Sequence, residues 1–296
     1  MAALPTIKQL RYLIALSETL SFTKAAESCF VGQSTLSAGL KELEESLGVQ
    51  LVERDKHSVS VTPIGRGVVE RAQRLIAQAD DLVEFVEGSA GSMVGVIKLG
   101  VIPTIAPFLL PTLLPKIRDQ FPKLKVVLRE DLSGNLMDKL NRHELDFALI
   151  ALPYDTDGFL TKELFDDEFW IIGNENDPAL QGKEIHLNNK LADRILLLEE
   201  GNCLRDQTIK ACKRSPAANH YGIEATSLLT LVQMVESDLG IALLPEMAVK
   251  SGLLKQTKLI AKPLSTPAPK RKIALVARPS TARIEEFNAL VKVMKR

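Results

Sequence analysis

Apolar positions in the first 62 residues recur at steps of three and four, which predicts a series of short amphipathic helices. The expected helices cover residues 7–20, 23–29 and 33–47. Gly48 follows the third helix, in the position where glycine commonly ends a helix. Residues 56–62 then alternate apolar and polar side chains, as a small two-stranded wing would. The short turn before residue 33 fits a helix-turn-helix, although a three-helix bundle without a role in DNA binding fits this pattern equally well.

A longer helix is expected from Pro63 to about residue 87. Its apolar residues form a heptad-like stripe, and a lone long helix leaves such a stripe largely uncovered. We therefore expect this linker helix to pack against a copy of itself, with an ordinary core helix as the alternative. The small residues that begin at Gly88 predict a hinge over residues 88–93.

From residue 94 onward, short apolar runs alternate with amphipathic stretches, which predicts an open, mainly parallel α/β sheet. Strands are expected at 96–102, 125–130, 147–152, 169–173, 195–198, 240–244 and 272–277. Helices are expected at 104–120, 135–143, 204–214, 228–238, 245–251 and 282–295. The length suits two such subdomains. Ligands of these sheets bind beyond the carboxyl ends of the strands, where Thr104, Ser133 and Thr226–Ser227 offer hydroxyl groups.

Composition limits the class of protein without identifying it. The 296 residues are 46% hydrophobic and 25% charged, and no apolar run reaches the length of a membrane span. The start of the chain has no signal-peptide pattern, so its three cysteines favour a cytoplasmic protein in which a disulfide would be regulatory. The formal net charge is zero, and the first 65 residues carry six Lys or Arg against seven Asp or Glu. DNA binding would therefore need a local basic surface.

Familiar catalytic and metal motifs are missing from the sequence. It contains no Walker loop, no His-Glu-x-x-His and no Cys-x-x-Cys pattern. Four scattered histidines and three cysteines do not suggest a metal site, so we expect neither a metal nor another cofactor.

The most informative chemistry is a pair of cysteines, Cys203 and Cys212. A strand at 195–198 and a turn at Gly201–Asn202 place Cys203 at or just before a helix N-terminus. The helix dipole there favours a thiolate, and nearby Arg205 and Lys210 add positive charge, so a lowered pKa is expected. Peroxide oxidises such a thiolate to a sulfenic acid, which a second thiol resolves.

The spacing of the two thiols suggests a switch. On one continuous helix, Cys212 lies about 13 Å further along the axis than Cys203. A disulfide needs Cα atoms no more than about 7 Å apart, so the helix would have to break for the two to pair. The alternative is that Cys212 is a small core residue and Cys203 merely begins a helix.

The N-terminal string resembles the DNA-binding domain of LysR-type transcriptional regulators nearly end to end. The matching motifs are Ser21-x-Thr23-x-Ala25-Ala26, Gln33-Ser34-x-Leu36-Ser37, Leu43-Glu44-x-x-Leu47-Gly48-x-x-Leu51-x-x-Arg54 and Thr62-x-x-Gly65. The resemblance implies that Gln33, Ser34, Thr35 and Ser37 lie on the recognition helix, and that Arg54 lies near phosphate in the wing. Gly32 and Gly39 depart from the usual residues. Cys29, where leucine is usual, is interpreted as a buried core residue.

The same family implies a complete architecture. It consists of a winged helix-turn-helix at 1–62, a dimerising linker helix at 63–87, a hinge at 88–93 and a regulatory domain at 94–296. That domain is expected to be α/β and to resemble periplasmic binding proteins, with lobe I at about 94–164 and 268–296 and lobe II at about 165–267. The implied partners are promoter DNA, RNA polymerase and further copies of the chain in a dimer of dimers.

Within this family, residues 199–207 (EEGNCLRDQ) with a cysteine nine positions after Cys203 closely resemble the redox segment of OxyR-type peroxide sensors. The resemblance implies that Cys203 is the peroxidatic thiol and Cys212 the resolving thiol. Stretches around Thr104 and Arg278 also match, so Thr104, Ser133 and Arg278 are candidates to bind hydrogen peroxide. Asn202 departs from the usual histidine, which leaves the local proton donor unassigned.

Three functions follow from these observations. The first is a regulator that senses peroxide through a reversible Cys203–Cys212 disulfide, rearranges its oligomer on promoter DNA and is reset by a cellular dithiol reductant. The second is a LysR-type regulator that binds a small organic anion between its lobes, with both cysteines incidental. The third is a thiol peroxidase, but the helix-turn-helix argues against an enzyme.

Overall fold

The computed structural model describes residues 4–54, 59–88, 93–212 and 224–295. The chain divides into two compact units with a boundary between Glu87 and Gly88, and Asn141–Glu144 group with the first unit. Residues 89–92, which hold most of the expected hinge, and residues 55–58, which hold the tip of the expected wing, lie outside the described part.

The N-terminal unit is a three-helix core with a small hairpin and a long helix. Its elements are α1 (Ile7–Thr19), α2 (Phe22–Ser28), α3 (Gln33–Leu47), β1 (Val52–Arg54), β2 (Val59–Val61) and α4 (Pro63–Gly88). β1 and β2 pair antiparallel as a wing would, but β1 lies before residues 56–62, where the whole wing was expected. Side chains of Thr6 and Ser21 cap the N-termini of α1 and α2, and Gly48 ends α3 with a positive φ of 68°. The predicted helix-turn-helix is confirmed.

The unusual Gly39 has a packing reason. A Cβ atom on this residue would lie 2.9 Å from Cδ2 of Tyr12, so the glycine allows the aromatic ring of α1 to lie against α3. The sequence predicted that Cys29 is a buried core residue, but in the structure it is only half-buried. It forms the C-cap of α2 and only borders the core, because the chain turns out of the helix at this residue.

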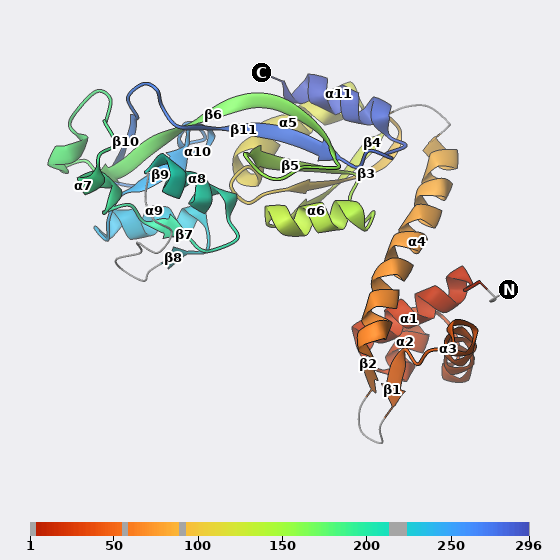
Figure 1. Ribbon diagram of the computed structural model, residues 1–296. Helices are drawn as coiled ribbons and strands as arrows, with labels where there is room; N and C mark the ends of the chain where they lie inside the picture. The colour runs from red at the N-terminus through yellow and green to blue at the C-terminus, as the bar shows by residue number, and fades with distance from the viewer. Residues whose placement is uncertain (1–3, 55–58, 89–92, 213–223, 296) are drawn as a thin grey trace. The chain divides into compact units, whose positions relative to one another are not determined.

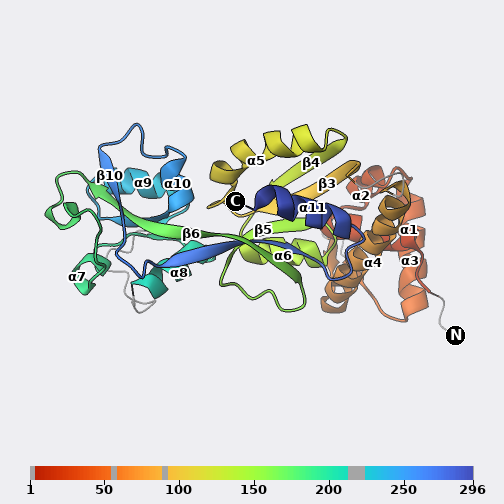
Figure 2. The ribbon, with the colours of Figure 1, turned by 90° about the horizontal axis from the view of Figure 1, so that it is seen from above.

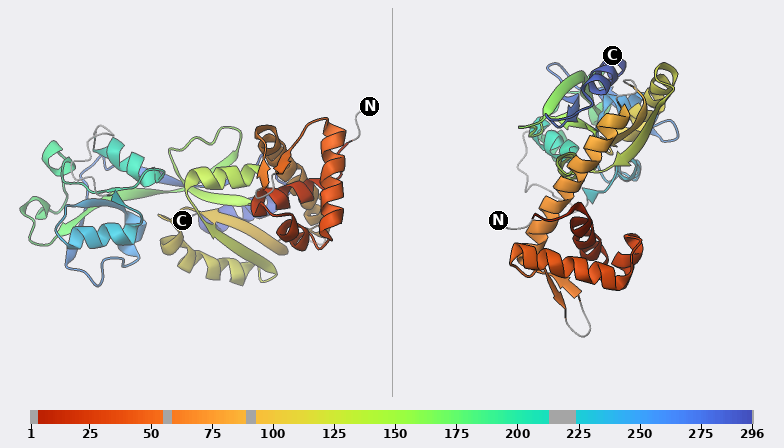
Figure 3. Two further views of the ribbon diagram at one scale, coloured as in Figure 1. Left: turned by 90° about the horizontal axis from the view of Figure 1, so that it is seen from below. Right: turned by 90° about the vertical axis from the view of Figure 1, so that its right-hand side faces the viewer.

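The linker helix α4 is 26 residues long, and its apolar stripe is only partly covered. Val69 and Ala72 near its start are buried against the helix-turn-helix core. Further along, Leu75, Leu82 and Val83 are exposed, with Leu82 keeping 65% of its side chain accessible. The right-hand view in Figure 3 shows how far this helix extends beyond the other helices of its unit. The exposed stripe supports packing against a second copy.

The C-terminal unit is built on one continuous seven-stranded sheet in the order β10-β6-β11-β5-β3-β4, with β9 also paired to β6. Its strands are β3 (Gly95–Val101), β4 (Leu124–Glu130), β5 (Phe147–Leu152), β6 (Leu160–Asn174), β9 (Ala242–Pro245), β10 (Leu259–Pro263) and β11 (Lys270–Ala277). A separate parallel pair joins β7 (Leu197–Leu198) to β8 (Glu224–Ala225). The helices are α5 (Ala106–Gln120), α6 (Ser133–Asn141), η1 (Pro178–Leu180), α7 (Asn189–Ala192), α8 (Cys203–Ala211), α9 (Leu228–Glu236), α10 (Glu246–Lys250) and α11 (Ile284–Met294).

The expectation of a mainly parallel sheet was wrong. β3 pairs parallel with β4 and β5, whereas β11 and β6 run antiparallel to their neighbours. The reason is that the chain crosses between the lobes on β6 and returns on β11. Figures 1 and 2 show these two long strands passing from one lobe to the other. The first half of β6 pairs with β11 and its second half with β9 and β10.

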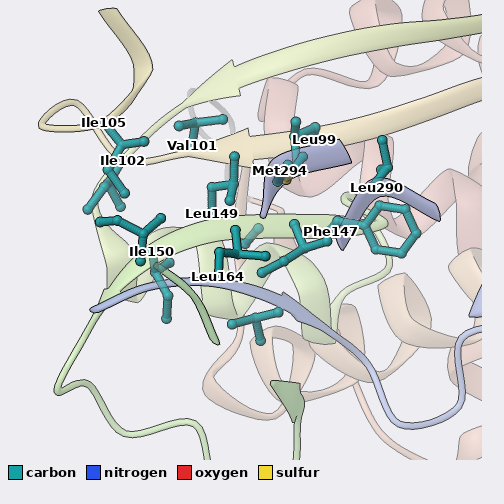
Figure 4. Packing of buried hydrophobic residues seen from close by; sticks show 14 of the residues in the cluster. Leu99, Val101, Ile102, Ile105, Phe147, Leu149, Ile150, Leu164, Leu290 and Met294 are labelled. Carbon is teal, nitrogen blue, oxygen red and sulfur yellow. The ribbon is translucent and has the colours of Figure 1, made fainter. Parts of the chain in front are cut away.

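Each lobe has its own apolar core, in line with the predicted two-lobed α/β architecture. The lobe I core gathers β3, β5 and β11 with α5, α6 and α11, and Figure 4 shows Phe147, Leu290 and Met294 packed within it. Figure 1 shows α11 and α6 on opposite faces of the lobe I sheet. The lobe II core surrounds β9, α8 and α9. Cys203 belongs to the first core and Cys212 to the second, so α8 connects the two lobes.

Candidate functional site at the border of the two lobes

Cys203 is the first residue of α8, as predicted, and Cys212 is its C-cap. The helix between them is continuous, so the two residues are about 13 Å apart along its axis. Both thiols are buried, with 8% and 6% of each residue exposed. Asn202 occupies the N-cap position without a side-chain hydrogen bond to the helix. A short helix without this cap, and with β-branched residues inside it, is marginal on its own and depends on its packing.

A buried arginine supplies the positive charge near Cys203. Arg271, at the start of β11, is 1% exposed and its charge acts on the thiol. Its Nε donates to Oδ2 of Asp167 at 3.0 Å, while Nη1 and Nη2 donate to Oγ1 and to the carbonyl oxygen of Thr104 at 2.8 and 2.9 Å. Oδ1 of Asp167 accepts from the backbone N–H of Met247 at 3.0 Å. This network joins residues of both lobes beside the thiol.

Thr104 is therefore held in place by Arg271. The following helix α5 has Ile105 at its N-cap and no side-chain cap, so a capping role for Thr104 is excluded. Since the Thr104 hydroxyl oxygen accepts from the guanidinium, its own O–H remains able to donate to another group.

The pKa of Cys203 differs from the expectation. Burial raises the pKa of this thiol above its ordinary value, while the charge of Arg271 and the Ser133 hydroxyl act in the opposite direction and Asp206 adds a further rise. The predicted contribution of Arg205 is wrong, because its guanidinium binds the Leu198 carbonyl oxygen and Glu224. The exposed Lys210 is almost two turns away. The neutral form of the thiol is thus favoured over the thiolate more than it would be at a helix N-terminus without burial.

Two buried polar atoms near Cys203 lack partners among the described residues. The hydroxyl oxygen of Ser133, at the start of α6, has no hydrogen-bond partner of ordinary geometry among the described residues, although it is close enough to Cys203 to stabilise the thiolate. Oε1 of Gln207 is also unpaired, while its Nε2 donates to the Leu152 carbonyl oxygen at 3.4 Å. Gln207 lies one helical turn after Cys203, on the same face of α8. Such atoms are suited to a small polar guest.

Ser133 acts directly on Cys203 and Thr104 is linked to it through Arg271, whereas Arg278 is not among the groups that act on the thiol. Nη1 of Arg278 donates to the carbonyl oxygens of Leu140 and Leu145 at the far end of α6, so its expected position beside the cysteines was wrong. Arg278 and Arg271 are seven residues apart along an extended strand, which corresponds to about 23 Å. Arg271 and Asp167 were missed from the sequence. The signal was the triplet Asp166–Glu168 opposite Lys270–Lys272.

The candidate DNA-contacting residues form a second site in the N-terminal unit. Gln33, Ser34 and Thr35 are exposed on the first turn of α3, and Ser37 is half-buried. Arg54 ends β1, and its side chain lies outside the described part. Gly32 precedes α3 as an N-cap without a side chain, which leaves the first backbone N–H groups of α3 without a side-chain cap.

Two other kinds of site are absent from the described residues. No three His, Cys, Asp or Glu side chains are arranged to hold a metal ion. None of the described helices is long and apolar enough to cross a membrane.

The helix-turn-helix and the regulatory domain both match known families. Residues 7–66 match the bacterial regulatory helix-turn-helix proteins of the lysR family, and residues 90–296 match the LysR substrate binding domain. A curated relative, the HTH-type transcriptional regulator EstR of Acinetobacter baylyi, is 42% identical over 100% of this chain and 98% of its own.

Two solved structures are similar over nearly the full length. A full-length OxyR from Pseudomonas aeruginosa with a cysteine-to-aspartate substitution is 35% identical, with a TM-score of 0.76 over 99% of this chain and 98% of that one. A cysteine-to-serine OxyR from Corynebacterium glutamicum bound to hydrogen peroxide is 30% identical, with a TM-score of 0.67 over 100% and 93%. With both of its domains matched, this chain belongs to the LysR family of DNA-binding transcriptional regulators.

Proposed function

We propose that this regulator senses hydrogen peroxide at Cys203 and stores the signal as a Cys203–Cys212 disulfide. The observation that carries the proposal is the surroundings of Cys203, a buried thiol within reach of the Arg271 charge and beside the unpaired polar atoms of Ser133 and Gln207. Buried polar atoms of this kind are costly unless a guest pairs with them. Hydrogen peroxide is a small molecule that both donates and accepts hydrogen bonds, so it could pair with these atoms.

The first chemical step consumes one peroxide. Sγ of the Cys203 thiolate attacks one peroxide oxygen, the O–O bond breaks, and the leaving hydroxide takes up a proton to become water. Cys203 is then a sulfenic acid. Arg271 favours the thiolate that begins the reaction, and the Thr104 hydroxyl is oriented by the same guanidinium to donate to a peroxide oxygen.

The second step forms the disulfide. Cys212 loses its proton and its thiolate attacks Sγ of the sulfenic acid, the S–O bond breaks, and the departing hydroxide takes up that proton and leaves as water. Because α8 keeps the thiols about 13 Å apart, this step requires α8 to unwind and one cysteine to leave its lobe core. A cellular dithiol reductant returns the pair to thiols.

Refolding of α8 connects the redox state to DNA. The helix touches both lobe cores, so its loss changes the surface of the regulatory domain. In a dimer of dimers joined through α4, such a change alters the spacing of the helix-turn-helix units on promoter DNA, and with it their contacts to RNA polymerase. The similarity to the peroxide-bound Corynebacterium protein supports peroxide as the signal.

The decisive experiment is mass spectrometry of alkylated peptides before and after stoichiometric peroxide. We expect a Cys203–Cys212 disulfide that a dithiol reverses, and a loss of the DNA response in Cys203→Ser with DNA binding retained. Two free thiols after peroxide treatment, or a responsive Cys203→Ser protein, would overturn the proposal.

The second candidate is a small organic anion as the signal. The 42% identity to EstR favours keeping it, because that protein is a different regulator from the peroxide sensors. In this case a metabolite would raise the melting temperature, and alkylating the cysteines would leave that shift unchanged.

A further inference from the structure

Tyr154 is a residue beside Cys203 that the mechanism has not yet used. It follows β5 by two residues and packs, partly buried, against the lobe I core that contains Cys203. No sequence pattern marks Tyr154, because it lies in a polar loop. Its position matters because Asn202 stands where histidine is usual, so no proton donor is yet assigned to the peroxide oxygen that departs.

The Tyr154 hydroxyl lies beside the residue that follows Ser133, and the segment just before Tyr154 is hydrogen-bonded to α8. On one side, the Tyr154 hydroxyl oxygen lies 3.4 Å from the position that a Cβ atom of Gly134 would occupy, and Gly134 directly follows Ser133, whose hydroxyl acts on Cys203. On the other side, Leu152 accepts a hydrogen bond from Gln207, one turn after Cys203 on α8. The loop that carries Tyr154 is thus fixed to both neighbours of the thiol.

The electrostatics agree with this placement. Burial raises the pKa of Tyr154, and the charge of the Cys203 thiolate raises it further, as do Asp138 and Asp155. The two ionisable groups are therefore within each other's field, and the phenol keeps its proton at neutral pH. A phenol is nevertheless a far stronger acid than water, so its proton passes downhill to a hydroxide.

We propose that the Tyr154 hydroxyl donates the proton to the oxygen that leaves when Cys203 reduces peroxide. The inference rests on the proposed function and adds a residue to it. As Sγ bonds to one oxygen and the O–O bond breaks, the departing oxygen takes the phenol proton and leaves as water. The phenolate then regains a proton from solvent, so the balance is one thiolate, one peroxide and one proton giving a sulfenic acid and water.

The test compares three reagents that differ in their leaving groups. Hydrogen peroxide expels hydroxide, which needs a proton to leave as water. Peracetic acid expels acetate and iodoacetamide expels iodide, and neither of these leaving groups needs a proton. In Tyr154→Phe, we expect the second-order rate of Cys203 with hydrogen peroxide to fall at least about tenfold, a conservative figure for losing a general acid. The rates with peracetic acid and iodoacetamide should remain near those of the unmodified protein. Tyr12→Phe is the matched control, because it removes a buried phenol oxygen from the other unit.

The outcomes separate the two proposals. A Tyr154→Phe protein that keeps its hydrogen peroxide rate, or that slows equally with all three reagents, would overturn the role of Tyr154 as a proton donor. If the unmodified protein forms no oxidised Cys203 with peroxide, the proposed function itself fails, and this inference fails with it. Circular dichroism of each variant verifies that the fold is retained.

Discussion

Arg271 and Asp167 face each other on neighbouring antiparallel strands and share a buried hydrogen bond of 3.0 Å between Nε and Oδ2. Because β6 and β11 are the two strands that pass between the lobes, this ion pair lies where the lobes are joined. It also holds the cation that acts on Cys203. The same interaction therefore serves both the stability of the domain and the reactivity of the thiol.

Arg271→Gln is predicted to make Cys203 less reactive. Without the guanidinium charge, the pKa of the thiol rises further, so alkylation by iodoacetamide at pH 8 should slow and its pH profile should move to higher pH. The variant should also lose about 3–5 kcal/mol of stability, because Asp167 is left buried without its partner. Adding Asp167→Asn should restore most of the stability but not the reactivity. An unchanged alkylation profile in Arg271→Gln would contradict this account.

The pKa of Cys203 also predicts how stability depends on pH. The folded protein holds the thiol proton more tightly than the unfolded chain, whose thiol titrates near the ordinary value of 9.0. The resulting stabilisation is complete below that pH and is lost as the pH rises through the folded-state pKa, with a slope of about 1.4 kcal/mol per pH unit. Urea unfolding at pH 8, 9 and 10 should show this loss. Cys203→Ser should lack this component of the decline, and parallel curves would refute the shift.

Unwinding of α8 is predicted to control the rate of disulfide closure. Lys210 is exposed on the last turn of the helix, where Lys210→Gly weakens the helix by about 1 kcal/mol relative to Lys210→Ala. Both variants lose the same charge. The glycine variant should therefore convert Cys203 sulfenic acid into the disulfide up to about fivefold faster than the alanine variant, as measured by quenched alkylation after excess peroxide. Equal rates would mean that α8 unfolds after closure or not at all.

Gln33 is predicted to discriminate between DNA sequences. It is exposed at the first position of α3, where an amide side chain can pair with a base edge. Gln33→Ala should reduce the preference for the operator over a mismatched site by about 1–3 kcal/mol at fixed salt concentration. Gln233→Ala, an equally exposed change in the regulatory domain, serves as the control. Anisotropy titrations that show an unchanged preference would remove Gln33 from the interface.

Local signals in the sequence were sufficient for most of the elements. α3 was predicted at its observed bounds because an apolar face and Gly48 mark it, and β5 was predicted exactly because it is an uninterrupted apolar run. The helix-turn-helix and the position of Cys203 at the start of α8 were likewise predictable. Each of these features depends on residues that are close in sequence.

Features that depend on distant residues were missed. Only residues 169–173 of β6 were expected, because its first half is rich in acidic residues that look like a surface loop. Those acids pair with the basic start of β11, and the alternation of strand side chains turns Arg271 and Asp167 inward while Lys270 and Lys272 remain outside. The source of the positive charge near Cys203 was wrongly predicted for the same reason. Arg205, near in sequence, binds Glu224, whereas Arg271, 68 positions away, acts on the thiol.

The strand β6, whose 15 residues belong to the hydrogen-bonded ladders of both lobes, has a mechanical consequence. Because the two lobes share this strand, a large rotation of one lobe against the other must break backbone hydrogen bonds along β6 or expose the Arg271–Asp167 pair to water. The nine-residue helix α8, which contacts the cores of both lobes, can refold without breaking those hydrogen bonds. A signal that refolds α8 leaves β6 paired in both lobes, so the regulatory domain can change its surface without a rotation of one lobe against the other.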